Sequence, residues 1–252
     1  MNTKRKDLIT NSIHSNILNE ERSFLVNLPK NNDEEKIEYP VLYHLDGDAV
    51  HIEDVLGFPG NKNSEDSITD MIYVSVVNTD RVRDMCPVKT SFCEKPGADQ
   101  FLKFFESELI PYINKNYQTS QFKVLCGQSF SSIFTLYALL EKPSLFNGYI
   151  TTSLYFPQCK EYFMDRARKT LASKKLNDRY LFMTLGRLDY DYNKDKITEH
   201  AIEDIIQIIK EQSQTELNWE YRVYEEYGHC PEPSYGDGLK WIFDAFKKLG
   251  GL

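Results

Sequence analysis

The 252-residue chain has no apolar run near the roughly 20 residues that a membrane-spanning helix needs, so we expect no membrane segment. No apolar core follows the basic stretch Lys4-Arg5-Lys6. The sequence thus predicts no secretory signal and a cytoplasmic protein, with export of a processed form left open. The formal net charge of −8 argues against a nucleic-acid-binding surface.

The five cysteines contain no C-x-x-C pair, and their odd number is atypical of a disulfide scaffold. We therefore expect free thiols and neither a structural metal nor a cofactor. Cys126 lies at the end of a predicted strand, where a small core residue is favoured over a cysteine nucleophile.

Predicted strands and helices alternate along most of the chain. A strand ending at Pro29 is followed by strands at 39–45, 70–77, 122–125, 149–152, 180–185 and 219–224. Helices are expected from Ala98 and over 133–140, 160–175, 197–210 and 239–249. Residues before Ile17 show no pattern, and 78–84 is expected to be a polar loop. The alternation predicts one α/β domain over 1–252, with three layers and a mostly parallel sheet.

One stretch combines a strand, a sharp turn and a helix start. Gly127-Gln128-Ser129-Phe130-Ser131 comes close to the G-x-S-x-G nucleophile elbow, with Ser131 in place of the last glycine. Such a turn exposes a serine hydroxyl to a base and places it at a helix N-terminus, which stabilises an oxyanion. The alternative for Ser129 is an ordinary helix N-cap.

Two later strand ends supply partners in the α/β-hydrolase order serine, acid, histidine. Asp189 and Asp191 follow the strand 180–185, and His229 follows the strand 219–224. Because the chemistry of such a sheet lies at the carboxyl ends of its strands, these residues are placed to meet Ser129. His229 is favoured as the general base, and Asp189 is placed before Asp191 as the acid that orients the imidazole.

With these motifs in place, the chain resembles the esterase family of α/β-hydrolases that includes esterase D, the enterochelin-type siderophore esterases and the mycolyltransferases. The siderophore-esterase branch is the nearest. The resemblance runs from about Ser15 to the C-terminus, and the family's usual Gly-Gly in the elbow is replaced here by Ser131-Ser132. Besides the elbow, it rests on the segments 17–22, 39–48, 78–87, 142–149 and 228–239.

The resemblance implies roles for single residues. Ser129 would be the nucleophile, His229 the base, and Asp189 the acid, because in this family the acid follows a Gly-x-x-Asp/Glu pattern. The backbone N–H groups of Phe130 and Asp48 would form the oxyanion hole. Preset backbone donors suit that task because they are fixed before charge develops.

Other polar and aromatic residues at strand ends are candidates for substrate binding. Arg81 and Arg83 could hold an anionic group or pair with neighbouring aspartates. Tyr155 and Phe156 could line an acyl or aryl pocket or pack in the core. Asp46 and Asp48 resemble the start of a calcium loop, but the rest of that spacing is absent, so no metal is expected.

The sequence therefore predicts a serine ester hydrolase with a Ser129, His229, Asp189 triad that acts on a small-molecule ester. The resemblance implies siderophore-type lactones as substrates. Feruloyl or acetyl esters of plant polysaccharides are the enzymatic alternative, because fold does not settle substrate. A hydrolase-like protein that binds without turnover is the alternative from another class.

Overall fold

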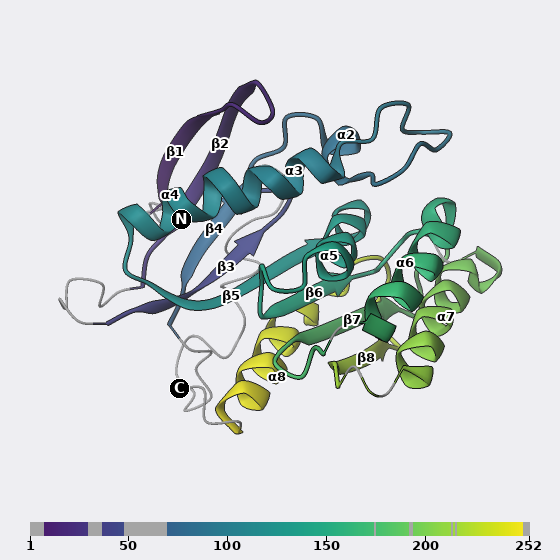
Figure 1. The fold of residues 1–252 in the computed structure, drawn as a ribbon. Coiled ribbons are helices and arrows are strands. Elements are labelled where there is room, and N and C mark those ends of the chain that lie inside the picture. Colours follow the sequence, from purple (N-terminus) through teal and green to yellow (C-terminus); the bar gives the residue numbers. More distant parts are fainter. Residues whose placement is uncertain are drawn as a thin grey trace, which may run out of the picture.

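The computed structural model describes residues 8–29, 37–47, 70–173, 175–191, 194–212, 214 and 216–248. In this part of the chain eight strands form one sheet in the order β1-β2-β4-β3-β5-β6-β7-β8 (Figure 1). The strands are β1 (Leu8–Ser15), β2 (Glu20–Asn27), β3 (Tyr39–His44), β4 (Ile72–Val76), β5 (Thr119–Gln128), β6 (Gly148–Thr152), β7 (Tyr180–Gly186) and β8 (Asn218–Tyr224). Neighbouring strands from β3 to β8 pair in parallel, whereas β1 and β2 form an antiparallel hairpin at one edge.

Helices cover both faces of the sheet. Residues of α3, α4, α5, α6 and α7 belong to one apolar core, and residues of α8 belong to a second core on the opposite face (Figure 1). The helices are α2 (Arg81–Met85), α3 (Ala98–Phe104), the π-helical η2 (Phe105–Leu109), α4 (Ile110–Asn116), α5 (Phe130–Glu141), η3 (Pro157–Cys159), α6 (Lys160–Ser173), η4 (Lys194–Lys196), α7 (Ile197–Glu211) and α8 (Ser234–Lys248). The predicted three-layer α/β-hydrolase fold is confirmed.

The central strands are mostly apolar, as expected for strands whose two faces are both covered. All five residues of β4 are buried, and successive side chains point to opposite faces. Ile72 and Val74 enter the core under α3 to α7, whereas Tyr73 between them enters the core under α8. In β5, Leu125 belongs to the first core and Val124 to the second.

The structure differs from the sequence prediction at three places. Strand β1 was missed because all but one of the residues of this edge strand are exposed or half-buried, so the strand carries no clear alternation of apolar residues. The expected loop at 78–84 contains the short helix α2, which Asp80 caps by accepting a hydrogen bond from the Arg83 N–H at 3.0 Å. Helix α8 begins at Ser234, five residues before the predicted start at 239. The buried Ser234 hydroxyl lies 3.0 Å from that of Thr184.

No helix in the described ranges is long and apolar enough to cross a bilayer.

Candidate active site

Four residues with a left-handed backbone gather beyond the carboxyl ends of the parallel strands. The angle φ is 63° at Asp46 after β3, 52° at Ser129 after β5 and 48° at Ser153 after β6. It is 56° at Cys230, in the segment after β8. Such conformations cost non-glycine residues on the order of 1–3 kcal/mol and cluster at functional sites. Together they mark this edge of the sheet as the candidate active site, where α/β proteins bind their ligands.

Ser129 occupies the turn between β5 and α5, with φ 52° and ψ −119°. Its N–H donates to the Thr152 carbonyl of the neighbouring strand at 2.8 Å, which fixes the turn to the sheet. A Cβ on Gly127 would come within 2.6 Å of the Ser131 carbonyl oxygen, so this position needs glycine for strand and helix to approach. The backbone of a nucleophile elbow is therefore present.

The two serines that replace the usual glycines turn their hydroxyls back toward the backbone. Ser131 accepts from the Gln128 N–H at 2.7 Å and lies within hydrogen-bond distance of the Gln128 carbonyl at 2.8 Å. The Ser132 hydroxyl donates to the Ser129 carbonyl. Both side chains are fully buried, so they tie the elbow to the first turn of α5.

The segments after β7 and β8 are joined by backbone contacts. A Cβ on Gly186 would lie 1.9 Å from the Gly228 carbonyl oxygen, so only glycine permits this approach. The Leu188 N–H donates to the Tyr227 carbonyl at 2.9 Å. The loops that carry the predicted acid and base are thereby held together.

Asp189 and His229 meet at the junction of these loops. The Asp189 Oδ2 atom lies 2.6 Å from His229 Nδ1, which is the contact by which an acid orients a catalytic imidazole. Asp189 is 3% exposed, whereas Asp191 lies on the surface. Asp189 and Asp191, which both follow β7 in the sequence, thus differ in burial, and it is Asp189 that contacts His229.

The His229 segment is also fixed to the strand beside the elbow. The Cys230 N–H donates to Ser153 Oγ at 2.8 Å, and Ser153 follows the residue that binds the Ser129 N–H. Burial, reinforced by the Asp189 charge, raises the pKa of Cys230 to about 12. Cys230 is therefore a neutral thiol at pH 7 and a poor nucleophile.

The two predicted oxyanion donors differ in what can be said of them. Phe130 is the first residue of α5, and the first N–H groups of a helix have no partner within the helix. Its position directly after Ser129 fits an oxyanion donor. Asp48 lies outside the described residues.

Arg81 places a fixed positive charge beside the elbow. Its guanidinium lies 5.4 Å from the centre of the Phe130 ring, and its Nε and Nη2 atoms donate to the two Asp46 oxygens at 2.6 and 2.7 Å. Burial would raise the pKa of Asp46, but hydrogen bonds from Arg81 and Asn78 hold that pKa below its usual value. The pair escaped the sequence analysis because its members are 35 residues apart.

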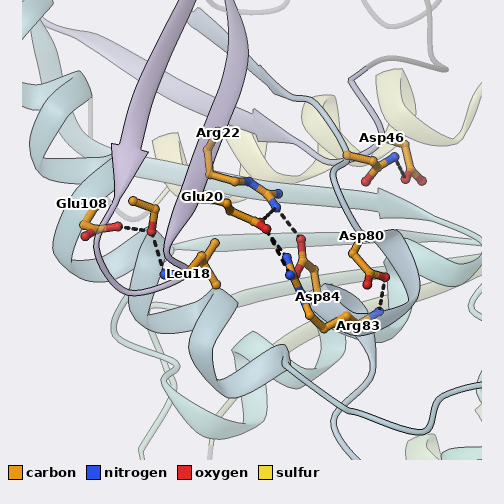
Figure 2. Close-up of polar contacts among 10 residues, drawn as sticks. Leu18, Glu20, Arg22, Asp46, Asp80, Arg83, Asp84 and Glu108 are labelled. Atoms are coloured by element: carbon orange, nitrogen blue, oxygen red, sulfur yellow. Dashed lines mark hydrogen bonds and ion pairs between the residues drawn. The ribbon is translucent and has the colours of Figure 1, made fainter.

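Arg83, which we predicted to bind substrate, is engaged in an ion-pair cluster (Figure 2), and its contact with substrate stays a prediction. It contacts Glu20 at 2.6 Å and Asp84 at 2.7 Å. Arg22, only 1% exposed, contacts the same two carboxylates at 2.9 and 2.6 Å. The alternative, in which Arg83 pairs with a neighbouring aspartate, is the one that the structure contains.

The aromatic candidates after β6 separate into two kinds. Phe156 is 1% exposed and packs edge-on against Phe163 with ring centres 5.4 Å apart, so it is a core residue rather than a pocket wall. Tyr155 is half-buried, and its contact with substrate stays a prediction. Phe92, which no sequence pattern marked, packs edge-on against Phe130 at 5.3 Å and is 37% exposed.

His44 is a buried histidine at the end of β3, but its surroundings exclude it as a base. Its ring lies between those of Tyr73 and Tyr235, at 5.7 and 5.2 Å, and neither nitrogen has a hydrogen-bond partner among the described residues. Burial lowers the pKa of His44 to about 4, so the ring is neutral at pH 7.

This burial predicts a loss of stability in mild acid. Between about pH 6.5 and 4 the unfolded chain protonates His44 and the folded chain does not, so the free energy of unfolding falls as pH falls. The loss in the free energy of unfolding that is due to His44 should reach about 3 kcal/mol near pH 4 and vanish above about pH 7. Urea unfolding of the native chain and of His44→Phe across this range measures it, and equal pH slopes in the two proteins would refute the assignment.

Among the described residues, no group of three or more histidine, cysteine, aspartate or glutamate side chains could hold a metal ion.

Comparisons with known proteins place the chain in a family. Residues 15–232 match a family model described as "Putative esterase". The match covers most of the chain, and the chain therefore belongs to this family of carboxylic ester hydrolases.

Similar proteins share the fold at low sequence identity. Ferri-bacillibactin esterase BesA of Bacillus subtilis (strain 168) is 23% identical over 216 residues, 76% of this chain and 73% of that protein. The IroE-like serine hydrolase from Shewanella oneidensis gives a TM-score of 0.80 at 22% identity, covering 95% of this chain and 81% of that one. Siderophore hydrolase EstB from Aspergillus nidulans gives 0.78 at 18% identity and 95% of both chains. The enterobactin hydrolase IroE in complex with DFP gives 0.68 at 19% identity, with 95% and 96% covered.

Proposed function

We propose that the chain is a serine esterase that cleaves siderophore-type lactone esters through Ser129, His229 and Asp189. The observation that carries the proposal is the 2.6 Å contact of buried Asp189 with His229, in loops that are fixed beside a strained serine turn. Family membership supplies the reaction class, and the siderophore hydrolases among the similar proteins support the substrate class.

In the proposed mechanism, His229 Nδ1–H donates to Asp189, which leaves Nε2 to accept the Ser129 proton. The Ser129 oxygen attacks the ester carbonyl carbon, and the Phe130 N–H stabilises the oxyanion that forms. Collapse of the tetrahedral intermediate breaks the ester C–O bond, and His229 returns the proton to the leaving alkoxide. Water then attacks the acyl-enzyme with His229 again as base, which releases the acid and restores Ser129.

The charge beside the elbow supports an oxygen-rich substrate. The Arg81 side chain is 38% exposed although its carboxylate partner is buried. A cation held in this way attracts anionic or catecholate oxygens next to the reacting carbonyl.

A substrate panel tests the proposal. We expect kcat/KM for bacillibactin, its ferric complex or enterobactin to exceed that for methyl ferulate by about 100-fold or more, because a site fitted to polar groups rejects esters that lack them. Chromatographic detection of the opened lactone measures the rates. The reverse order would favour a feruloyl esterase, and binding without cleavage of any ester would favour a non-catalytic binding protein.

A further inference from the structure

The end of β6 carries a strained serine to which the proposed mechanism gives no role. Ser153 is 1% exposed and has a φ of 48°, a region that an L-residue occupies only where its surroundings require it. It stands between a strand that pairs with the elbow strand and the short helix η3. Because the Ser153 backbone is fixed, its hydroxyl is held in one place.

That hydroxyl binds the backbone of the histidine loop. Ser153 Oγ accepts from the Cys230 N–H at 2.8 Å, and Cys230 is the residue directly after His229. Cys230 is itself left-handed, with φ 56°, so the contact joins two backbones whose conformations are both restricted. The position of the His229 main chain is thereby defined relative to the end of β6.

The same stretch of β6 also holds the proposed nucleophile. The Thr152 carbonyl accepts from the Ser129 N–H at 2.8 Å, so two consecutive residues bind the elbow on one side and the histidine loop on the other. Asp189 fixes the imidazole from the β7 side, through its 2.6 Å contact with Nδ1. That contact does not fix the distance between the imidazole ring and Ser129, because Ser129 follows β5, two strands away from β7 in the sheet.

We infer that Ser153 is a positioning residue of the esterase site, which sets the distance between His229 and Ser129. The inference rests on the proposed function. A base must lie within hydrogen-bond reach of its nucleophile, and a misplacement of about 1 Å can cost about 100-fold in rate. Loss of the Ser153 hydroxyl leaves the other loop contacts in place, including that of the Leu188 N–H with the Tyr227 carbonyl. The fold should therefore survive while the alignment degrades.

The test compares Ser153→Ala with a matched loss of a buried hydroxyl elsewhere. Thr170 Oγ1 donates to the Leu140 carbonyl at 2.8 Å, at the C-terminal end of α5, so Thr170→Val removes a similar bond at the end of the helix away from the elbow. We expect Ser153→Ala to lower kcat by about 10- to 100-fold with KM within about twofold, and Thr170→Val to change neither. Urea midpoints should fall by similar amounts in the two variants.

A second variant separates alignment from stability. Ser153→Gly also removes the hydroxyl but relieves the left-handed φ, so we expect stability near that of the native chain with kcat as low as in Ser153→Ala. If the native chain is active and both Ser153 variants keep its kcat, the inference is overturned and the proposed function is not. The same holds if kcat falls in Ser153→Ala but returns to the native value in Ser153→Gly. A native chain that is inert toward every ester overturns the proposed function, and the inference with it.

Discussion

Replacing Ser129 by alanine is expected to lower kcat/KM for the preferred ester by about 10³-fold or more, because no acyl-enzyme can form. The substitution keeps the Cβ and the backbone conformation of the elbow, so the fold should be unchanged. The residual rate should come only from the oxyanion donors and from substrate binding, which act without the nucleophile. Steady-state kinetics of Ser129→Ala and of the native chain, compared on the same ester, measures the loss.

The control is a serine-to-alanine change on the surface. Ser144 is exposed and lies in the loop between α5 and β6, at the opposite end of the parallel strands from the elbow, so Ser144→Ala should keep the native rate. If Ser129→Ala retained more than about a tenth of the native kcat/KM, the chemistry would have to reside elsewhere.

The second large effect concerns stability and the ion-pair cluster of Figure 2. Replacing Asp84 by asparagine is expected to lower the free energy of unfolding by about 3 kcal/mol, because it removes the charge that faces two guanidinium groups. Arg22 and Asp84 are both 1% exposed, so water cannot replace the lost carboxylate, and Glu20 alone is left to face the Arg22 and Arg83 guanidinium groups. For a chain of this size the melting temperature should fall by about 6–12 °C.

An exposed pair provides the matched control for Asp84. Asp99 contacts Lys103 at 2.7 Å, with both side chains more than half exposed, and such surface pairs contribute about 0–1 kcal/mol. Asp99→Asn should therefore change the melting temperature little. If Asp84→Asn were no more destabilising than Asp99→Asn, the cluster would not be a buried structural unit.

The cluster also explains why helix α2 lies where it does. Asp84 and Arg83 on α2 contact Arg22 and Glu20 on β2, so the helix is fixed to the edge of the sheet. Arg81 begins the same helix and reaches the elbow. The cation beside the elbow is thus carried by a helix that buried charges hold in place.

Much of the fold could be predicted from the sequence because the central strands have both faces covered. Nearly continuous apolar runs such as Ile72–Val76 can be recognised in the sequence without knowledge of their partner strands. Strand β1 could not be predicted, because an edge strand gains its stability from pairing with β2 rather than from its own apolar pattern. The start of α8 was missed because buried Ser234 is fixed by a tertiary contact.

The candidate site could be predicted as far as chain order and strand ends carry it. Ser129, Asp189 and His229 follow strands whose order is visible in the sequence. The choice of Asp189 over Asp191 needed the contact across two loops. Arg81 with Asp46, and Ser153 with Cys230, join residues distant in sequence, and no local pattern reports such pairs.

The most direct test of the central claim is the mass of the folded chain after reaction with a fluorophosphonate, followed by mapping of the modified peptide. Our account predicts one adduct per chain, on Ser129, forming at least about 100-fold more slowly in His229→Ala, because only a deprotonated serine attacks phosphorus at a useful rate. An adduct on another residue, or a folded native chain that hydrolyses esters without being labelled, would contradict it.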